Sequence, residues 1–165
     1  MRAALLAGQI PKNKPIATDT TIPRPVAHSG TTALMYSGSA QGCSANYVYF
    51  KAFSVNIPIT SATKLSYWIY PQQDNGRYVG VDFHCTDGTT LRDSGAVDYT
   101  GCTMHPHGGH CGISLNAWSL IECNVGQWLA GKTVDKIWIA YDRPNSTGQF
   151  RGYIDDIKIT NNSIP

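Results

Sequence analysis

The sequence predicts an all-β protein, an antiparallel β-sandwich with minor helix, and two observations support this prediction. First, 16 Gly and 9 Pro residues separate short runs rich in Tyr, Trp, Val, Ile and Thr, the residue types that favour strands. Second, no window combines a 3.6-residue apolar period with helix caps. The runs expected to form strands are, in order, residues 47–55, 64–70, 78–85, 118–124, 136–141 and 151–159.

Alternation predicts the faces of the second and third strands, because successive strand side chains point to opposite sides. In residues 78–85, the side expected to face the core carries Val79, Val81, Phe83 and Cys85. A turn at residues 74–76 predicts that strands 64–70 and 78–85 form a hairpin. The face turned away from the core would then gather Trp68, Tyr70, Tyr78, Asp82 and His84.

The last strand, residues 151–159, contains two adjacent carboxylates, Asp155 and Asp156, between isoleucines. Alternation predicts that one of the two points toward the core. A buried carboxylate needs a cation or several hydrogen-bond donors, so a structural metal or a buried Arg partner is expected here.

The length of 165 residues suits one domain, and we expect residues 1–165 to form a single sandwich. Residues 1–25 are expected to be a loop-rich leading segment, because four prolines there disfavour long strands. The apolar run near Met1 is shorter than a signal-peptide core, so we interpret the chain as a piece of a larger secreted protein.

The charge pattern excludes several classes of protein. Charged residues make up 15% of the chain, the net charge is +2, and no five like charges are adjacent. These values disfavour disorder, a nucleic-acid groove and a polybasic membrane patch. No stretch approaches 18 apolar residues, so no membrane span is expected, and we expect a monomer.

Cysteines and histidines concentrate in residues 102–111. The histidines of this tract, His105, His107 and His110, could bind zinc or copper. Alternatively, Cys102 and Cys111 form a disulfide that closes the loop, which is favoured in a secreted protein. Cys85 and Cys123 fall on core faces, as a second bridge or as two buried thiols, and Cys43 is expected to be the unpaired cysteine.

No catalytic signature is present in the sequence. The chain has one glutamate, Glu122, and lacks both the G-x-S-x-G and H-E-x-x-H motifs. Residues 126–133 match the phosphate-loop pattern, but a strand-like run follows where that loop requires a helix. We therefore expect a protein that is not an enzyme.

Several segments carry a resemblance to a known family. Residues 152–157 (GYIDDI) resemble the last strand of jelly-roll carbohydrate-binding modules, and residues 65–71, 81–84 and 87–95 are similar to ancillary sandwich domains of secreted bacterial glycoside hydrolases, including α-mannosidases and α-glucanases. The resemblance spans residues 26–160. It implies a jelly-roll sandwich with a structural calcium bound by Asp155 and Asp156. Asp19 is the only acidic residue before residue 60, and so the only acidic candidate there for a further calcium ligand.

The residues also favour sugar binding on physical grounds. Sugar rings present flat C–H faces and hydroxyl rims, which suit aromatic platforms beside short polar side chains. The expected binding residues are Trp68, Tyr70, Tyr78, Asp82 and His84, with Arg92, Asp142 and Arg143 as further contacts to hydroxyls or uronates. The same aromatic residues could instead belong to the sandwich core.

The sequence thus leads to a hypothesis with two alternatives. The hypothesis is an extracellular, non-catalytic module that binds a polysaccharide or oligosaccharide and holds an attached glycoside hydrolase near it. The first alternative is a small metal-dependent carbohydrate-active enzyme that uses the histidine tract. The second is a purely structural sandwich that packs against its parent catalytic domain and exposes a large apolar surface when isolated.

Overall fold

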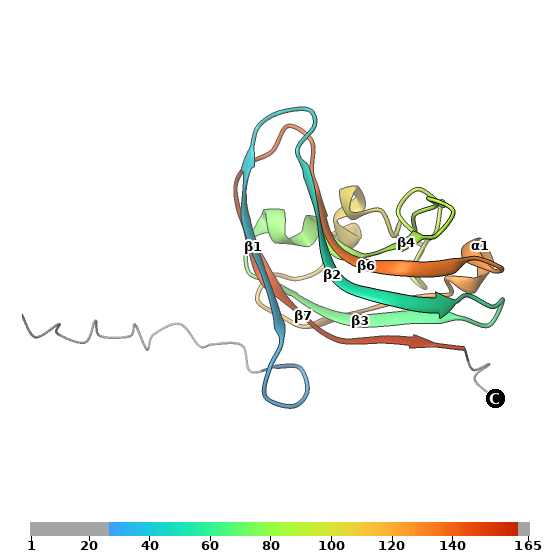
Figure 1. Ribbon diagram of the computed structural model, residues 1–165. Helices are drawn as coiled ribbons and strands as arrows, with labels where there is room; N and C mark the ends of the chain where they lie inside the picture. Colours follow the sequence, from blue (N-terminus) through green and yellow to red (C-terminus); the bar gives the residue numbers. More distant parts are fainter. Residues whose placement is uncertain (1–26, 162–165) are drawn as a thin grey trace, which may run out of the picture.

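The computed structural model describes residues 27–161, so the predicted leading segment and Asp19 lie outside the described residues. The described chain forms two antiparallel sheets that pack as a sandwich (Figure 1). Sheet A has the strand order β1-β7-β3-β5, and sheet B has the order β2-β6-β4. The predicted antiparallel sandwich with minor helix is confirmed.

All six predicted strands are present in residues 27–161, and in this part of the chain a seventh strand, β1, precedes them. The elements in chain order are β1 (Leu34–Gln41), β2 (Tyr47–Pro58), β3 (Lys64–Pro71), the 3-10 helix η1 (Asp74–Tyr78), β4 (Val79–Cys85), the 3-10 helix η2 (Pro106–Cys111), β5 (Ser119–Cys123), α1 (Gly126–Leu129), β6 (Thr133–Asp142) and β7 (Thr147–Thr160).

The core lies between the two sheets and follows the alternation of the strands. From sheet B, the inward side chains of β4 are fully buried, as predicted for Val79, Val81, Phe83 and Cys85. From sheet A, Leu65, Tyr67, Ile69 and Ile154 face them. These side chains supply the apolar burial that stabilises the sandwich.

The predicted hairpin of strands 64–70 and 78–85 is wrong. β3 pairs with β5 and β7, whereas β4 pairs with β6 in the other sheet. The segment between them is not a tight turn but the 3-10 helix η1, which carries the chain from one sheet to the other. Trp68 and Tyr70 therefore lie on one side of the sandwich and Asp82 and His84 on the other, and the single face predicted for them does not form.

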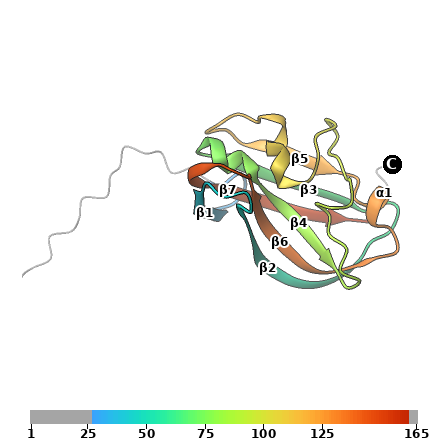
Figure 2. The same cartoon turned by 90° about the horizontal axis from the view of Figure 1, so that it is seen from above.

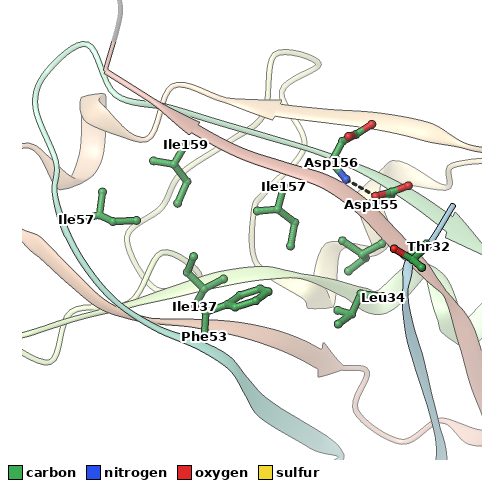
Figure 3. Close-up of a pocket in the computed structure, with 11 residues that line it drawn as sticks. Thr32, Leu34, Phe53, Ile57, Ile137, Asp155, Asp156, Ile157 and Ile159 are labelled. Carbon is green, nitrogen blue, oxygen red and sulfur yellow. Dashed lines mark hydrogen bonds between the residues drawn. The ribbon is translucent and has the colours of Figure 1, made fainter. Parts of the chain in front are cut away.

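The prediction that one of Asp155 and Asp156 points toward the core is also wrong. The pairing of β7 with β3 shifts between the partners of Ser66 and Trp68, which is the mark of a β-bulge. Asp156 sits in this bulge with φ of +49°, so the alternation slips by one residue. Both carboxylates leave the core side, while Ile157 and Ile159 turn inward (Figure 3).

Sheet B is strongly bent. β2 and β6 curve together in Figure 1, and the segment between β4 and β5 lies on the inner side of that curve. In the view of Figure 2, sheet B lies in front, with this connecting segment along its β4 side. No helix in residues 27–161 is long and apolar enough to cross a membrane.

The cysteines form one disulfide and leave three free thiols, as predicted by the interpretation in which Cys102 pairs with Cys111. Cys102 and Cys111 form a disulfide within the long connection from β4 to β5. Cys85 and Cys123 are two buried free thiols, and Cys43 is free and exposed. The disulfide closes a loop of residues 102–111 and so restricts where its histidines can lie.

Candidate functional site

The outer face of sheet B carries a line of aromatic rings that crosses its three strands. The ring centroids of Tyr47 and Tyr49 are 5.4 Å apart, those of Tyr49 and Trp138 5.8 Å, and those of Trp138 and His84 5.0 Å. We call these four residues the aromatic row. They come from β2, β6 and β4, so the row runs across the strands.

Strand register explains why these side chains meet. Trp138 lies opposite Lys51 of β2 on one side and Asp82 of β4 on the other, and all three point away from the core. Residues two positions apart share a face, which places Tyr49 and Tyr47 beside Lys51. Tyr47, at the edge of the sheet, is 57% exposed.

The guanidinium of Arg92 lies over two rings of the row. Its central carbon is 4.0 Å from the ring centroid of Tyr49 and 5.4 Å from that of Trp138. The same group donates to Asp82 at 2.7 Å, and its Nε lies 3.2 Å from a carboxylate oxygen of Asp93. Stacking and ion pairing together hold Arg92 in one orientation.

Asp82 is the buried anchor of this arrangement. Its side chain is only 1% exposed, and one of its oxygens accepts from the backbone N–H groups of Phe83 and Arg92 at 2.8 and 3.0 Å. Burial raises the pKa of Asp82, and the hydrogen bonds and charge of Arg92 oppose that rise. Burial is also the main reason that the pKa of Tyr49 rises to about 12.

A second polar group stands at the β4 end of the row. Nδ1 of His84 lies 2.6 Å from Asp135, and Nζ of Lys136 donates to the same carboxylate at 2.7 Å. These hydrogen bonds, first that of Lys136 and then that of His84, lower the pKa of Asp135. The group is half-exposed and presents fixed polar atoms beside Trp138.

A third polar group borders the row from the disulfide-closed loop. Nε2 of His105 lies 3.9 Å from Asp142 and 4.0 Å from Asp93. Asp142 ends β6, and its carboxylate accepts a hydrogen bond of 3.4 Å from the Tyr49 hydroxyl. The row is thus flanked by carboxylate, imidazole, ammonium and guanidinium groups, a mixture that can donate to and accept from hydroxyls.

Four of the eight predicted binding residues meet on this face: Asp82, His84, Arg92 and Asp142. Sequence reasoning missed Tyr47, Tyr49 and Trp138 as site residues. The two tyrosines could have been found from the sequence, because they lie two positions apart in a run predicted as a strand and so share one face.

The other four predicted residues lie elsewhere. Trp68 and Tyr70 are on the outer face of sheet A, where Tyr70 contacts Trp118 and Trp68 stacks against His28 at 3.8 Å. Tyr78 ends η1 at one end of the sandwich, with the Arg143 guanidinium 4.1 Å from its ring centroid. Arg143 is held there by hydrogen bonds of 2.6 Å to Asp74 and Asn75.

The residues predicted to bind calcium are already engaged by protein donors. Asp156 accepts from the Ser29 hydroxyl at 2.6 Å and contacts Nδ1 of His28 at 2.9 Å, while Asp155 accepts from backbone N–H groups of Ser29 and Asp156. Calcium takes six to eight oxygen ligands. These two carboxylates alone do not form such a site, and with Asp19 outside the described residues, calcium binding stays a prediction.

The histidines predicted to bind zinc or copper do not converge. His110 is buried, and its Nε2 lies 2.8 Å from the carbonyl oxygen of Val79. His107 is exposed, and the centroid of its ring lies 6.1 Å from that of His105, which faces Asp142. Within residues 27–161, no group of three or more His, Cys, Asp or Glu side chains is placed to hold a metal ion.

Comparison with known proteins adds to this picture at the level of fold. No protein-family model and no curated protein sequence matches the chain. Among solved structures, the glycoside hydrolase domain of Endo-D from Streptococcus pneumoniae R6 is similar, with a TM-score of 0.53 and 19% identity over 82% of this chain and 19% of that chain. The likeness shows the fold.

A second solved structure, described as being with xylogluco-oligosaccharide, has a TM-score of 0.48 and 18% identity, over 80% of this chain and 32% of its own. The present chain spans about a third or less of the length of both proteins.

Proposed function

We propose that the protein is a non-catalytic carbohydrate-binding module of jelly-roll type, and that the aromatic row of sheet B is its binding face. The observation that carries this proposal is the row itself, four successive aromatic rings on the outer face of sheet B, with Arg92 held against two of them and Tyr47 57% exposed. Aromatic faces suit the C–H faces of pyranose rings, and the flanking polar groups suit hydroxyls.

The wider setting of the proposal is an extracellular protein in which the module accompanies a glycoside hydrolase. The similarity in fold to a glycoside hydrolase domain and the Cys102–Cys111 disulfide support this setting. The module would hold the attached enzyme near its polysaccharide and so raise the local substrate concentration.

Affinity electrophoresis against glucans, mannans and xylans tests the binding function. We expect at least one polysaccharide to retard the protein. The Trp138→Ala variant should lose this retardation, whereas Trp118→Ala, a half-buried tryptophan on the outer face of sheet A, should keep it. Tyr47→Ala provides a second site variant whose exposed side chain contributes little to folding.

Two outcomes would contradict the proposal. If no polysaccharide retards the protein, the binding function is wrong. If Trp118→Ala abolishes binding and Trp138→Ala does not, the binding face is wrong. Release of reducing sugar from the same polysaccharides, measured in parallel, would show catalysis and contradict the non-catalytic part of the proposal.

A second candidate function, packing against an attached domain, is favoured by an apolar seam along the open edge between β1 and β2. Phe50 and Phe53 of β2 are 55% and 48% exposed, and Leu34 and Met35 of β1 are exposed beside them. A groove of about 660 Å³ opens here, with Ile57, Ile137, Ile157 and Ile159 in its walls (Figure 3). Such a contiguous apolar surface is typical of interaction sites.

Matched variants separate the two functions. Phe53→Ser should leave polysaccharide affinity unchanged and should reduce the fluorescence of the apolar dye ANS bound to the protein. Tyr47→Ala should reduce polysaccharide affinity and leave the fluorescence of bound ANS unchanged. If Phe53→Ser abolishes polysaccharide binding while the protein stays folded by circular dichroism, the seam rather than the aromatic row is the glycan site.

A further inference from the structure

The charges around the aromatic row are almost completely paired with one another. Arg92 is bound to Asp82 and Asp93, and Lys136 is bound to Asp135. Both of these cations therefore already have a carboxylate partner. A ligand carboxylate or sulfate would have to displace that partner, which in the case of Asp82 would leave a buried charge unpaired.

The balance of charge on the face is also unfavourable for an anion. Four carboxylates lie on or beside the row, those of Asp82, Asp93, Asp135 and Asp142. Three cations face them, Arg92, Lys136 and Lys51. Lys51, exposed and directly opposite Trp138, is the one of these cations that makes no ion pair with the described residues.

The polar atoms that stay available suit hydroxyl groups. Arg92 uses Nη1 and Nε in its ion pairs, and Nη2 has no acceptor among residues 27–161. The carboxylates of Asp142 and Asp135 each keep lone pairs beyond their present hydrogen bonds. Neutral hydroxyls can both donate to these carboxylates and accept from Nη2 without disturbing any ion pair.

The length of the row indicates the size of the ligand. The row crosses three strands, and adjacent strands lie about 4.8 Å apart, so it extends about 10 Å from β2 to β4. One pyranose ring covers only part of that distance. The row therefore offers contacts to more than one sugar of a chain.

We infer that the aromatic row takes an extended, uncharged glycan chain laid across the strands, and that it discriminates against uronate-containing and sulfated polysaccharides. This inference rests on the proposed function and specifies its ligand class.

Calorimetric titration with neutral and acidic polysaccharides tests the inference. The neutral probes are glucan, mannan and xylan, with their oligosaccharides, and the acidic probes are alginate and polygalacturonate. We expect affinity for a neutral polymer that changes by less than about twofold between low and high salt, because no ion pair forms. Affinity should rise from the monosaccharide to the oligosaccharide, and Lys51→Met should leave it within about twofold.

Other outcomes separate this inference from the proposed function. Binding of alginate or polygalacturonate that weakens about tenfold or more with salt, or that Lys51→Met abolishes, would overturn the inference and leave carbohydrate binding intact. Equal affinity for a monosaccharide and its oligosaccharide would overturn the extended mode. Binding of neither class would refute the proposed function itself.

Discussion

Arg92 donates a hydrogen bond of 2.7 Å to Asp82, whose carboxylate is only 1% exposed on the outer face of sheet B. Asp82 belongs to β4, whereas Arg92 arrives from the long connection that follows it. The pair ties this connection to the sheet and fixes the guanidinium against Tyr49. The stability of the fold and the geometry of the candidate site therefore depend on the same contact.

Replacing Arg92 by alanine should destabilise the protein strongly. The substitution leaves the Asp82 carboxylate buried without its cation, and breaking a buried pair in this way costs about 3–5 kcal/mol. Guanidinium chloride unfolding measures the loss. Arg151→Ala, which removes an exposed arginine of β7, should change the free energy of unfolding by about 0.5 kcal/mol or less. A loss under about 1 kcal/mol for Arg92→Ala would show that water or another group replaces the guanidinium.

The ion pair at Asp135 should make stability depend on pH in the acid range. Lys136 and His84 hold the pKa of Asp135 below its ordinary value of about 3.9. The stabilisation is complete above that ordinary pKa, and it is lost as the pH falls through the lower pKa of the folded protein. We expect the Tm of the wild type to exceed that of Asp135→Asn at pH 7, and the difference to shrink below about pH 4.

The other carboxylates titrate in both proteins, so the comparison isolates Asp135. A Tm difference that stays constant from pH 7 to pH 2 would contradict the assignment.

The three free cysteines should differ sharply in reactivity. Cys43 is exposed, whereas Cys85 and Cys123 are fully buried. Burial raises the pKa of both buried thiols, that of Cys123 to about 12, and the thiolate is the reactive form. At pH 8 a disulfide reagent such as DTNB should titrate one thiol in the native protein and three after denaturation. Cys43→Ser should give none in the native state, and a second native thiol would contradict the burial.

The strands could be predicted from the sequence, but their partners could not. Alternation with period two is a local signal, and it located β2 to β7 and the buried side of β4. The assignment of β3 and β4 to different sheets depends on contacts between distant segments. β1 was missed because it contains small residues such as Gly38, whose use becomes clear only where Phe150 packs against it.

For the candidate site, too, the direction of individual side chains could be predicted from the sequence, but their neighbours could not. His84 and Asp82 were placed on an outward face correctly, since alternation determines that face. The partners of that face could not be deduced, because Trp138 arrives through pairing with β6 and Arg92 through a loop. The expected hairpin placed Trp68 on the same face as Asp82 and His84, whereas Trp68 lies in sheet A, paired with β7.

The bulge in β7 leads to a prediction about the backbone of Asp156. Its φ of +49° is a conformation that glycine adopts freely and that costs other residues about 1–2 kcal/mol, most of all β-branched ones. Asp156→Gly and Asp156→Val both lose the contacts to His28 and Ser29, so the difference between them reports chiefly the backbone conformation. We expect the valine variant to be less stable than the glycine variant by about 2 kcal/mol in chemical denaturation.

Asp155 provides the control for that comparison. It precedes the bulge in ordinary strand conformation and pairs with Trp68, and valine favours strands more than glycine does. The order of stability should therefore reverse, with Asp155→Val more stable than Asp155→Gly. If valine is the more stable substitution at both positions, Asp156 does not hold a left-handed bulge. The two carboxylates would then alternate between the faces of β7, with one of them turned toward the core.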